Sequence, residues 1–388
     1  MELVFDIETD DLDATEIHCI VAIDENNKQY TFDIIDDNIL KGLDFLAEAD
    51  KLIGHNIIGF DIPVIKKLHG INLWSKNKII DTLVLSRLFN PVREKGHSLK
   101  VWGSKLGVAK DTPPEDFTVY TKDTLKYCIK DVVLNKALFE YLKKESAGFS
   151  KSSIELEHHV TYILEQQKVN GFKIDIKHTT NLLSELNFKI KEVQDKVHNT
   201  FKPKWVDIKE VKPKLKQNGM LSKSGLTDYE YEDIKLSGNM KPFMRQDLVE
   251  FNLGSRKQIG EYLISFGWKP KKFTPTGQPI VDEGTLKKII HIKEAKLIAD
   301  FLLYQKRIAQ ISSWLDSIKA DDRVHGSVVS TGAITGRMSH RSPNMAQVPS
   351  VSSPYGEECR ACWIVDEGHK LVGIDASGLE LRLLAHYM

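Results

Sequence analysis

The pattern of apolar and polar positions divides the chain into parts of different character. Four short apolar runs near the N-terminus predict strands, at residues 3–8, 17–23, 29–34 and 51–54. Apolar residues recur with helical spacing over residues 40–47 and 123–144. Three consecutive strands followed by alternating helices and strands indicate a mixed sheet covered by helices. We therefore predict an α/β domain over residues 1–150, with a boundary at 146–150.

The middle of the chain has a helical pattern. Long segments of helical spacing occupy residues 154–169, 179–197, 255–266 and 283–318. A basic stretch with Pro and Gly interrupts them at residues 200–250 and predicts a mobile loop or tip. Short strands and turns return from residue 324, and the apolar run at 371–375 predicts a strand. We expect a mainly helical domain over 151–322 and part of an α+β domain over 323–388.

The composition is that of an ordinary globular chain. Its 388 residues include 54 Lys+Arg and 54 Asp+Glu, and 41% are hydrophobic. This length favours about two or three domains. No apolar run approaches about 18 residues and the N-terminus lacks a basic region, so the sequence predicts neither a membrane-spanning helix nor a signal peptide. Four cysteines are too few for a disulfide scaffold, which favours a reducing compartment.

The charges are unevenly distributed although their sum is zero. Residues 1–50 contain 15 acidic and only two basic residues, whereas residues 202–223 contain seven lysines and two acids. An acidic segment can concentrate metal ions, and a basic segment can lie on phosphates. A solvated surface is the competing interpretation of both segments.

Acidic side chains in the first 150 residues form a candidate metal centre. Asp6 and Glu8 are two apart on a predicted strand, so both side chains lie on one face. Tyr127 and Asp131 are four apart on a predicted helix and share a face. With Asp61, these residues offer four carboxylates and a phenol. Oxygen ligands without His or Cys suit a hard cation, Mg²⁺ or Mn²⁺, and a pair of ions can cleave a phosphodiester.

Each carboxylate has a distinct expected role. Asp6 would bridge two ions, Glu8 and Asp131 would complete one ion site, and Asp61 would hold the second ion. Tyr127 would orient the attacking water. Any one pair of acids could equally cap or solvate a strand end, so the prediction depends on the combination.

The spacing of these residues resembles a known nuclease family. Asp6-Ile7-Glu8-Thr9, then His55-Asn56-x₃-Phe60-Asp61, then Tyr127-x₃-Asp131 resembles the DEDD-type 3′→5′ exonucleases of the Tyr subclass. The resemblance covers residues 1–145 and implies an RNase H-like fold. It also implies that the five acidic and phenolic residues are the functional set. His55 and Asn56 would shape the loop or contact the terminal nucleotide. Asp81 is interpreted as a carboxylate that is structural or that supports the metal ligands from behind.

The rest of the chain resembles family A DNA polymerases, in particular the replicative polymerases of short-tailed bacteriophages. The matching segments are residues 169–175, 251–259, 331–337, 343–349 and 375–382. The last of them matches polymerase motif A. The resemblance implies an exonuclease, a thumb and the first part of a palm, with DNA as the partner.

The same resemblance assigns roles on the polymerase side. Asp375 would hold a catalytic Mg²⁺, and Glu380 would lie near the sugar of the incoming nucleotide. Contacts with DNA would come from Arg337, Asn344, Gln347 and Arg360. Arginine pairs bidentately with phosphate, and Asn or Gln can reach minor-groove acceptors.

Two features depart from the expected pattern or compete with it. The resemblance implies a thumb loop that captures thioredoxin as a processivity factor, but residues 200–250 are shorter than the resemblance leads us to expect. Direct DNA contact is the alternative, through Lys202, Lys204, Lys212, Lys214 and Lys216. Cys359 and Cys362 form a Cys-x₂-Cys without a second pair, so we interpret them as core residues and not as zinc ligands.

The chain stops at Met388, in the expected helix after motif A. We therefore expect the fingers and the second palm carboxylate to come from a C-terminal polymerase fragment. A split gene, an intein or intron junction and an incomplete gene annotation are equally open explanations. A free-standing exonuclease with a DNA-binding thumb and a structural half of a split polymerase are the alternatives. By resemblance, the expected location is the cytoplasm of an infected bacterial host.

Overall fold

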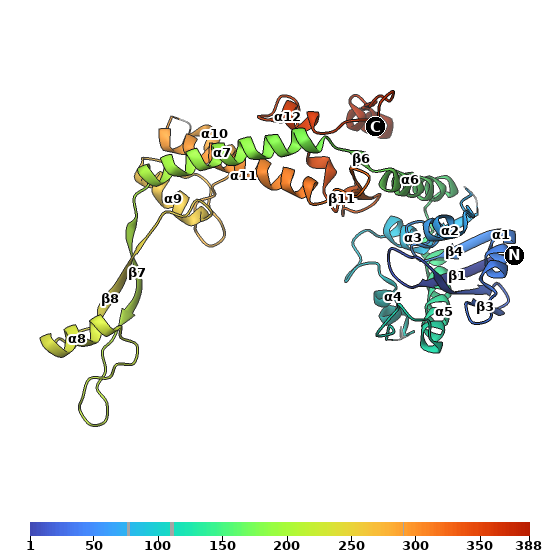
Figure 1. Cartoon of the computed structure of the whole chain (residues 1–388), viewed down its shortest axis with the longest axis horizontal. Helices are drawn as coiled ribbons and strands as arrows, with labels where there is room; N and C mark the ends of the chain where they lie inside the picture. Colours follow the sequence, from blue (N-terminus) through green and yellow to red (C-terminus); the bar gives the residue numbers. More distant parts are fainter. Residues whose placement is uncertain (76–77, 109–111, 290) are drawn as a thin grey trace. The chain divides into compact units, whose positions relative to one another are not determined.

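The computed structural model describes residues 1–75, 78–108, 112–289 and 291–388 (Figure 1). They form two compact units. The first contains Met1–Asp175 and Asp316–Met388, and the second contains Ile176–Leu315. The segment 151–175, assigned to the thumb by its sequence pattern, thus belongs to the same unit as the first 150 residues. No helix in the described ranges has both the length and the apolar character needed to cross a bilayer.

The first unit is built on a five-stranded mixed sheet of order β3-β2-β1-β4-β5. Its strands are β1 (Glu2–Thr9), β2 (Ile17–Asp24), β3 (Gln29–Asp33), β4 (Lys51–Gly54) and β5 (Ile79–Asp81). The first three strands pair antiparallel, and β4 pairs parallel with both β1 and β5. The predicted meander and mixed α/β class are confirmed.

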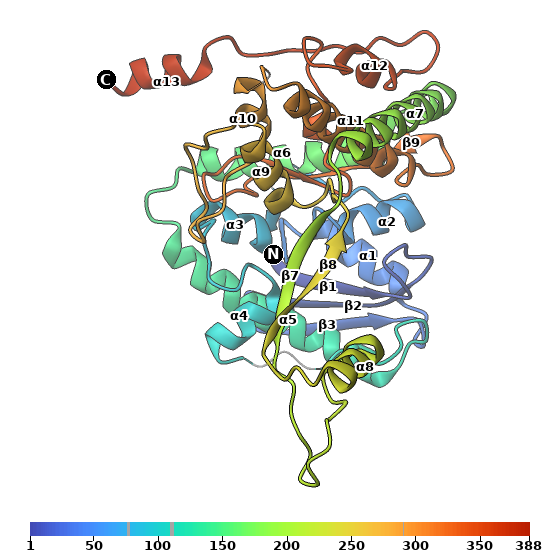
Figure 2. The same ribbon diagram turned by 90° about the vertical axis from the view of Figure 1, so that its left-hand side faces the viewer.

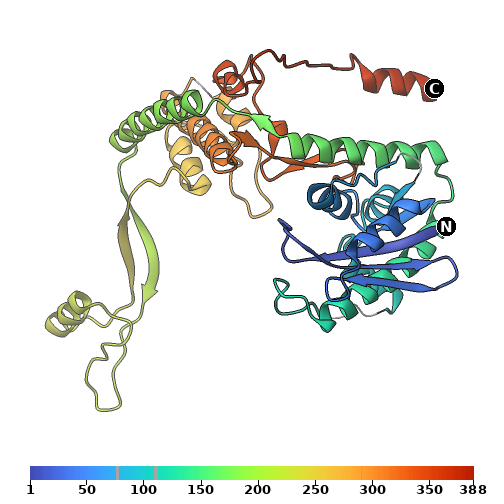
Figure 3. The ribbon, with the colours of Figure 1, turned by 45° about the vertical axis from the view of Figure 1, so that its right-hand side comes forward.

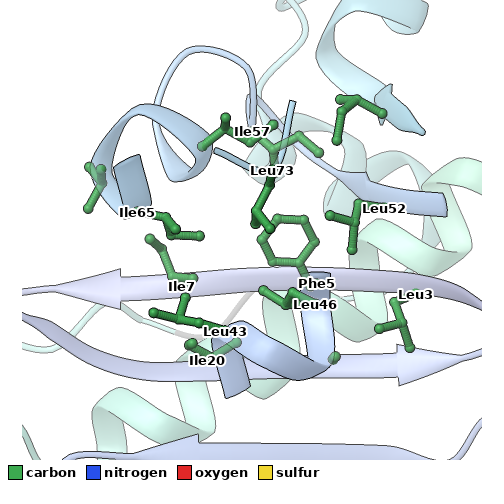
Figure 4. Close-up of a cluster of buried hydrophobic side chains, with 14 of the residues drawn as sticks. Leu3, Phe5, Ile7, Ile20, Leu43, Leu46, Leu52, Ile57, Ile65 and Leu73 are labelled. Carbon is green, nitrogen blue, oxygen red and sulfur yellow. The ribbon is translucent and has the colours of Figure 1, made fainter. Parts of the chain in front are cut away.

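Helices cover both faces of this sheet. Successive side chains of β1 point to opposite faces, so each face offers apolar residues against which helices pack. Leu3, Phe5 and Ile7 pack with residues of α1 (Ile39–Glu48) and α2 (Asp61–His69), as Figure 4 shows. Val4, one position out of phase, packs with Cys128 and Val132 of α5 (Lys122–Glu145). Side chains in the register of Val4 therefore point to the α5 side of the sheet.

A long helix joins the sheet to the C-terminal segment of the same unit. This helix, α6 (Lys151–Asn170), packs against α3 (Thr82–Phe89) and against β10 (Ser327–Val329) (Figure 3). Strand β10 pairs antiparallel with β11 (Ser339–Arg341). Smaller elements complete the unit: α4 (Leu99–Leu106), β6 (Phe172–Lys173), β9 (Arg323–Val324), a 3₁₀ turn (Met345–Gln347) and α12 (Gly356–Ala361).

One predicted strand is wrong. Residues 371–375 form no strand, and Ile374 is 94% exposed. A strand needs a hydrogen-bonded neighbour, and none of the strands in the described ranges pairs with this segment. The helix expected after it is present as α13 (Leu379–Tyr387).

The second unit is a helical body that carries a two-stranded ribbon. Helices α7 (Ile176–Thr200) and α11 (Lys293–Leu315) pack along each other, and α9 (Arg256–Ser265) and α10 (Glu283–Lys288) complete the body. The single helical pattern predicted over 283–318 is therefore two helices. Its core contains Phe201, Phe251 and Leu263.

The segment predicted as a mobile loop or tip is instead a β-ribbon. Strands β7 (Lys204–Val211) and β8 (Phe243–Val249) pair antiparallel, and α8 (Asp228–Ser237) lies in the segment that joins them (Figure 2). Strand β7 contains the β-forming residues Trp205, Val206 and Ile208, all of which are exposed. The charged residues beside them favoured a loop in the sequence pattern. We call residues 204–249 the β7–β8 ribbon.

Candidate functional site

The structure brings Asp6 and Glu8 together on the α5 side of the sheet. Their ligand atoms and the Cys128 Sγ all lie within 4.8 Å of one another. Both carboxylates are half-buried, and the Cys128 Sγ is 3.9 Å from the Asp6 Oδ2. The predicted shared face of the two acids is confirmed. Cys128 was missed, because nothing local in a helix sequence shows which strand it contacts.

Cys128 does not change the kind of ion that suits this cluster. Burial raises the pKa of its thiol well above the ordinary value, and Cys19 and the nearby carboxylates add to the rise. The thiol therefore stays protonated, whereas a thiolate is the form that binds soft metals. The donors that remain are carboxylate oxygens.

Asp61 lies at the start of α2, where it is 2% exposed. Its Oδ1 accepts a hydrogen bond of 3.2 Å from the backbone N–H of Ile7, the residue between Asp6 and Glu8. Burial raises the pKa of Asp61 to about 7, and the charge of Asp81 adds to the rise. A carboxyl group held this way is stabilised in its ionised form by a bound cation.

Asp131 and Asp6 line one cavity of about 550 Å³, together with His55 and Asn56. Asp131 is 4% exposed on α5. Tyr127, one helical turn earlier, is half-buried with its ring 6.0 Å from that of Phe117 and lines a separate hollow. The fold thus places Asp6 and Asp131 at one cavity and keeps Tyr127 outside its lining.

Asp81 holds the loop that shapes one side of the cavity. Its carboxylate, 1% exposed, accepts from the backbone N–H groups of Asn56 at 2.9 Å and Ile58 at 3.1 Å. It also caps α3 by accepting from the N–H of Leu83 at 2.9 Å. The structural interpretation of Asp81 is confirmed. His55 joins the same framework, because its Nδ1 lies 2.9 Å from the Thr82 Oγ1.

The residues expected to contact DNA are exposed and lie apart from the cavity lining. Arg337, Asn344, Gln347 and Arg360 are all in this class. The Asn344 side chain accepts from the N–H of Ala346 and begins the 3₁₀ turn, and the Arg360 Nε donates to the Pro349 carbonyl at 2.9 Å. Asp375 and Glu380 are also exposed.

The lysines around the ribbon differ in their contacts. The Lys204 Nζ lies 3.7 Å from the ring centre of Tyr262, and Lys212 pairs with Glu210 at 2.8 Å. Lys202, Lys214 and Lys216 are exposed. Exposed ion pairs are weak, so Lys212 can exchange Glu210 for a phosphate at little cost.

Cys359 and Cys362 are both fully buried and unbridged. The Cys362 Sγ, at the residue that follows α12, donates to the carbonyl of Glu358 within that helix. Within the described ranges, neither cysteine belongs to a cluster of metal-ligating side chains. Their interpretation as core residues is confirmed.

Known proteins match this chain along its whole length. The model of "DNA polymerase family A" matches residues 234–388. The "DNA-directed DNA polymerase" of Escherichia phage T7 is 30% identical over 100% of this chain and 69% of its own length. The chain belongs to DNA polymerase family A. The phage T3 enzyme has the same identity and coverage.

Further relatives of this family A chain agree with the assignment. "DNA polymerase I" of Helicobacter pylori is 37% identical over 36% of this chain and 15% of its own length. The solved structure "POL domain of Pol1 from M. smegmatis complex with DNA primer-template and dNTP" has a TM-score of 0.69 at 16% identity. It covers 99% of this chain, which spans 58% of that longer chain, and it shows likeness of fold. The matches support a DNA-directed DNA polymerase, a class that acts on DNA with divalent metal ions.

Proposed function

We propose that this family A polymerase chain carries a metal-dependent 3′→5′ exonuclease that removes nucleotides from DNA 3′ ends. The supporting observation is that the Asp6 and Glu8 carboxylates lie together, with Asp131 at the cavity that Asp6 lines. An RNase H-like fold and the domain limits 1–150, 151–322 and 323–388 belong to the same proposal.

The donor chemistry suits Mg²⁺ or Mn²⁺. Asp6 and Glu8 offer oxygen donors, and the protonated thiol of Cys128 offers no competing soft ligand. Asp61 carries a buried carboxyl group whose charge needs compensation. In a two-ion arrangement, Asp6 would bridge, Glu8 and Asp131 would complete one site, and Asp61 would serve the other.

The proposed reaction is hydrolysis of the last phosphodiester. The carboxylates of Asp6, Glu8, Asp61 and Asp131 would hold divalent cations, which would supply an activated water and neutralise charge at the scissile phosphate. Water attacks phosphorus, the bond from phosphorus to the O3′ of the preceding nucleotide breaks, and that O3′ takes a proton. Tyr127 would orient the water, and His55 and Asn56 would contact the departing nucleotide.

The polymerase side of the proposal concerns Asp375 and Glu380. Asp375 would hold a catalytic Mg²⁺, and Glu380 would lie beside the sugar of the incoming nucleotide. Two-metal transfer also needs a second acid and groups that bind the triphosphate. We propose that fingers and further palm sequence outside residues 1–388, on the same polypeptide or a separate C-terminal fragment, provide them.

Contacts with DNA complete the proposal. Arg337, Asn344, Gln347 and Arg360 would contact the primer–template. Lys212, Lys214 and Lys216 of the β7–β8 ribbon would contact its phosphates, and a thioredoxin-like processivity factor on the ribbon is the competing candidate. The proposed location of the protein, the cytoplasm of an infected bacterial host, is consistent with these roles.

Primer degradation and primer extension with Mg²⁺ test both halves of the proposal. Residues 1–388 should shorten a labelled single strand from its 3′ end and should extend a primer only after addition of a fingers–palm fragment. Asp375→Asn should abolish extension and leave degradation unchanged. Absence of Mg²⁺-dependent degradation by the wild-type chain would refute the exonuclease, and extension by residues 1–388 alone would refute the need for further sequence.

A further inference from the structure

The cavity at Asp6 and Asp131 has a second, cationic side. Arg87 of α3, Arg341 of β11 and Lys168 of α6 line it together with the two carboxylates. We call these three residues the cationic wall. They lie far apart in the sequence and meet because α6 packs against both α3 and β10, the partner strand of β11.

Arg87 and Arg341 form a like-charged pair in this wall. Arg87 is half-buried, and Arg341 is exposed. Burial lowers the pKa of Arg87, the neighbouring charge of Arg341 lowers it further, and Asp81 partly opposes these effects. The Arg87 guanidinium nevertheless stays protonated, since arginine loses its proton only far above neutral pH. Like charges held close together favour an anion between them.

No carboxylate in the described part of the chain forms an ion pair with either arginine. Asp81, whose charge partly opposes the lowering of the Arg87 pKa, is already engaged by the backbone N–H groups of the loop and of α3. Lys168 differs, because its Nζ lies 2.9 Å from the Glu165 carboxylate. The two arginines are therefore the part of the wall that is open to an external anion.

Besides the acids Asp81 and Glu165, neutral and hydroxyl side chains line the same cavity as the two arginines. His97 lines the cavity with its Nδ1 2.9 Å from the Ser86 Oγ, and burial followed by the charges of Arg87 and Arg93 lowers its pKa, which keeps the ring neutral. The Thr161 Oγ1 and Ser330 Oγ, 3.4 Å apart, link α6 to the end of β10 at the same cavity. Such groups can add hydrogen bonds to phosphate oxygens but carry no competing charge.

We propose that Arg87 and Arg341 bind a backbone phosphate of the single DNA strand whose 3′ end lies at Asp6 and Asp131. The inference rests on the proposed exonuclease and adds positioning residues to it. A planar guanidinium matches two phosphate oxygens and reads no base, as a sequence-independent nuclease requires. Arg341 lies within the residues that match the polymerase family model, so that segment contributes to the exonuclease cavity.

The test compares Arg87→Gln and Arg341→Gln with wild type and with Lys66→Gln, a charge control at an exposed α2 lysine outside the cavity lining. The measurements are KM and kcat for degradation of a single-stranded oligonucleotide with Mg²⁺. A lost charge-assisted hydrogen bond corresponds to about a tenfold to hundredfold rise in KM for Arg87→Gln, with a smaller rise for exposed Arg341. Arg87→Lys should recover part of the loss, and Lys66→Gln should behave as wild type.

A modified substrate gives an independent measurement on the unmutated protein. Oligonucleotides with one neutral methylphosphonate, placed in turn at each of the first few linkages upstream of the scissile one, should show a single position with raised KM. With the methylphosphonate at that position, Arg87→Gln should raise KM little further. Equal KM at every position, or unchanged KM in both arginine variants of an active enzyme, would overturn the inference and leave the exonuclease standing. An inactive wild type that still binds the strand in fluorescence anisotropy, with weaker binding in Arg87→Gln, would refute the exonuclease but support the phosphate contact.

Discussion

The Asp61 carboxylate accepts a hydrogen bond from the backbone N–H of Ile7. This contact ties the start of α2 to the strand residue between Asp6 and Glu8. It places a buried acid, with pKa raised to about 7, next to the strand that carries the other two carboxylates. The buried charge of Asp61 destabilises the folded protein without a cation but can bind one for catalysis. Removing this charge should therefore raise the stability of the metal-free protein and lower its activity.

We expect Asp61→Asn to stabilise the metal-free protein at pH 8 and to abolish exonuclease activity. The folded-state pKa is raised above the unfolded value, so the folded protein binds more protons, and the stability conferred by protonated Asp61 is lost as pH rises from about 4 through about 7. Asn keeps an acceptor for Ile7 without a charge. Thermal unfolding in EDTA at pH 5 and pH 8 measures the effect, with exposed Asp44→Asn as control. A variant less stable than wild type at pH 8 would contradict the assignment.

We expect the affinity for Mg²⁺ to depend on pH in the direction opposite to the stability of the metal-free protein. Mg²⁺ binding favours ionised Asp61, so the apparent affinity for Mg²⁺ should rise with pH up to about 7 and then level off. Titration calorimetry at several pH values measures it. An affinity independent of pH would show that Asp61 does not bind the ion.

Removing both strand carboxylates should remove catalysis. We expect Asp6→Ala with Glu8→Ala to lower kcat by several orders of magnitude, because few other groups stabilise the charge that develops on phosphate. Tyr127→Phe should be milder, since the ions can still activate water. Single-turnover degradation of a labelled strand provides the measurement. Wild-type rates in the double variant would show that the carboxylates are structural.

Asp81→Ala should lower the stability of the folded protein. Its carboxylate accepts from the N–H groups of Asn56, Ile58 and Leu83, and its loss leaves one buried and two partly buried donors without this partner. A lost helix cap and unsatisfied N–H groups together predict a loss of about 3–5 kcal/mol. Urea unfolding followed by circular dichroism measures it. Asp116→Ala, at an exposed turn, should cost far less, and equal losses in the two variants would contradict the role of Asp81.

The lysines of the β7–β8 ribbon should contribute to the salt dependence of DNA binding. Lys214→Ala with Lys216→Ala should flatten the plot of log affinity against log salt by about two units if both contact phosphate. Lys212→Ala should add up to about one more unit, because its exposed pair with Glu210 is easily exchanged. Anisotropy titrations of duplex DNA at several salt concentrations supply the slopes. An unchanged slope would favour a protein partner on the ribbon.

The sequence by itself determined the features that depend on neighbours along the chain. The two-residue period of a strand places Asp6 and Glu8 on one face, and the register of α5 places Tyr127 one turn before Asp131. The order of the acidic motifs, together with motif A at 375–382, indicated the polymerase family that the comparisons confirm. These signals are local, so packing was not needed to read them.

Only the tertiary structure decided which distant segments meet. Cys128 beside Asp6, the burial that raises the pKa of Asp61, and the approach of Arg341 to Arg87 all depend on contacts between segments far apart in sequence. The segment 371–375 shows the converse, because its apolar pattern suits a strand but no strand in the described ranges pairs with it. Periodicity fixes which way a side chain points within an element, whereas burial, pKa and pairing depend on what packs against that element.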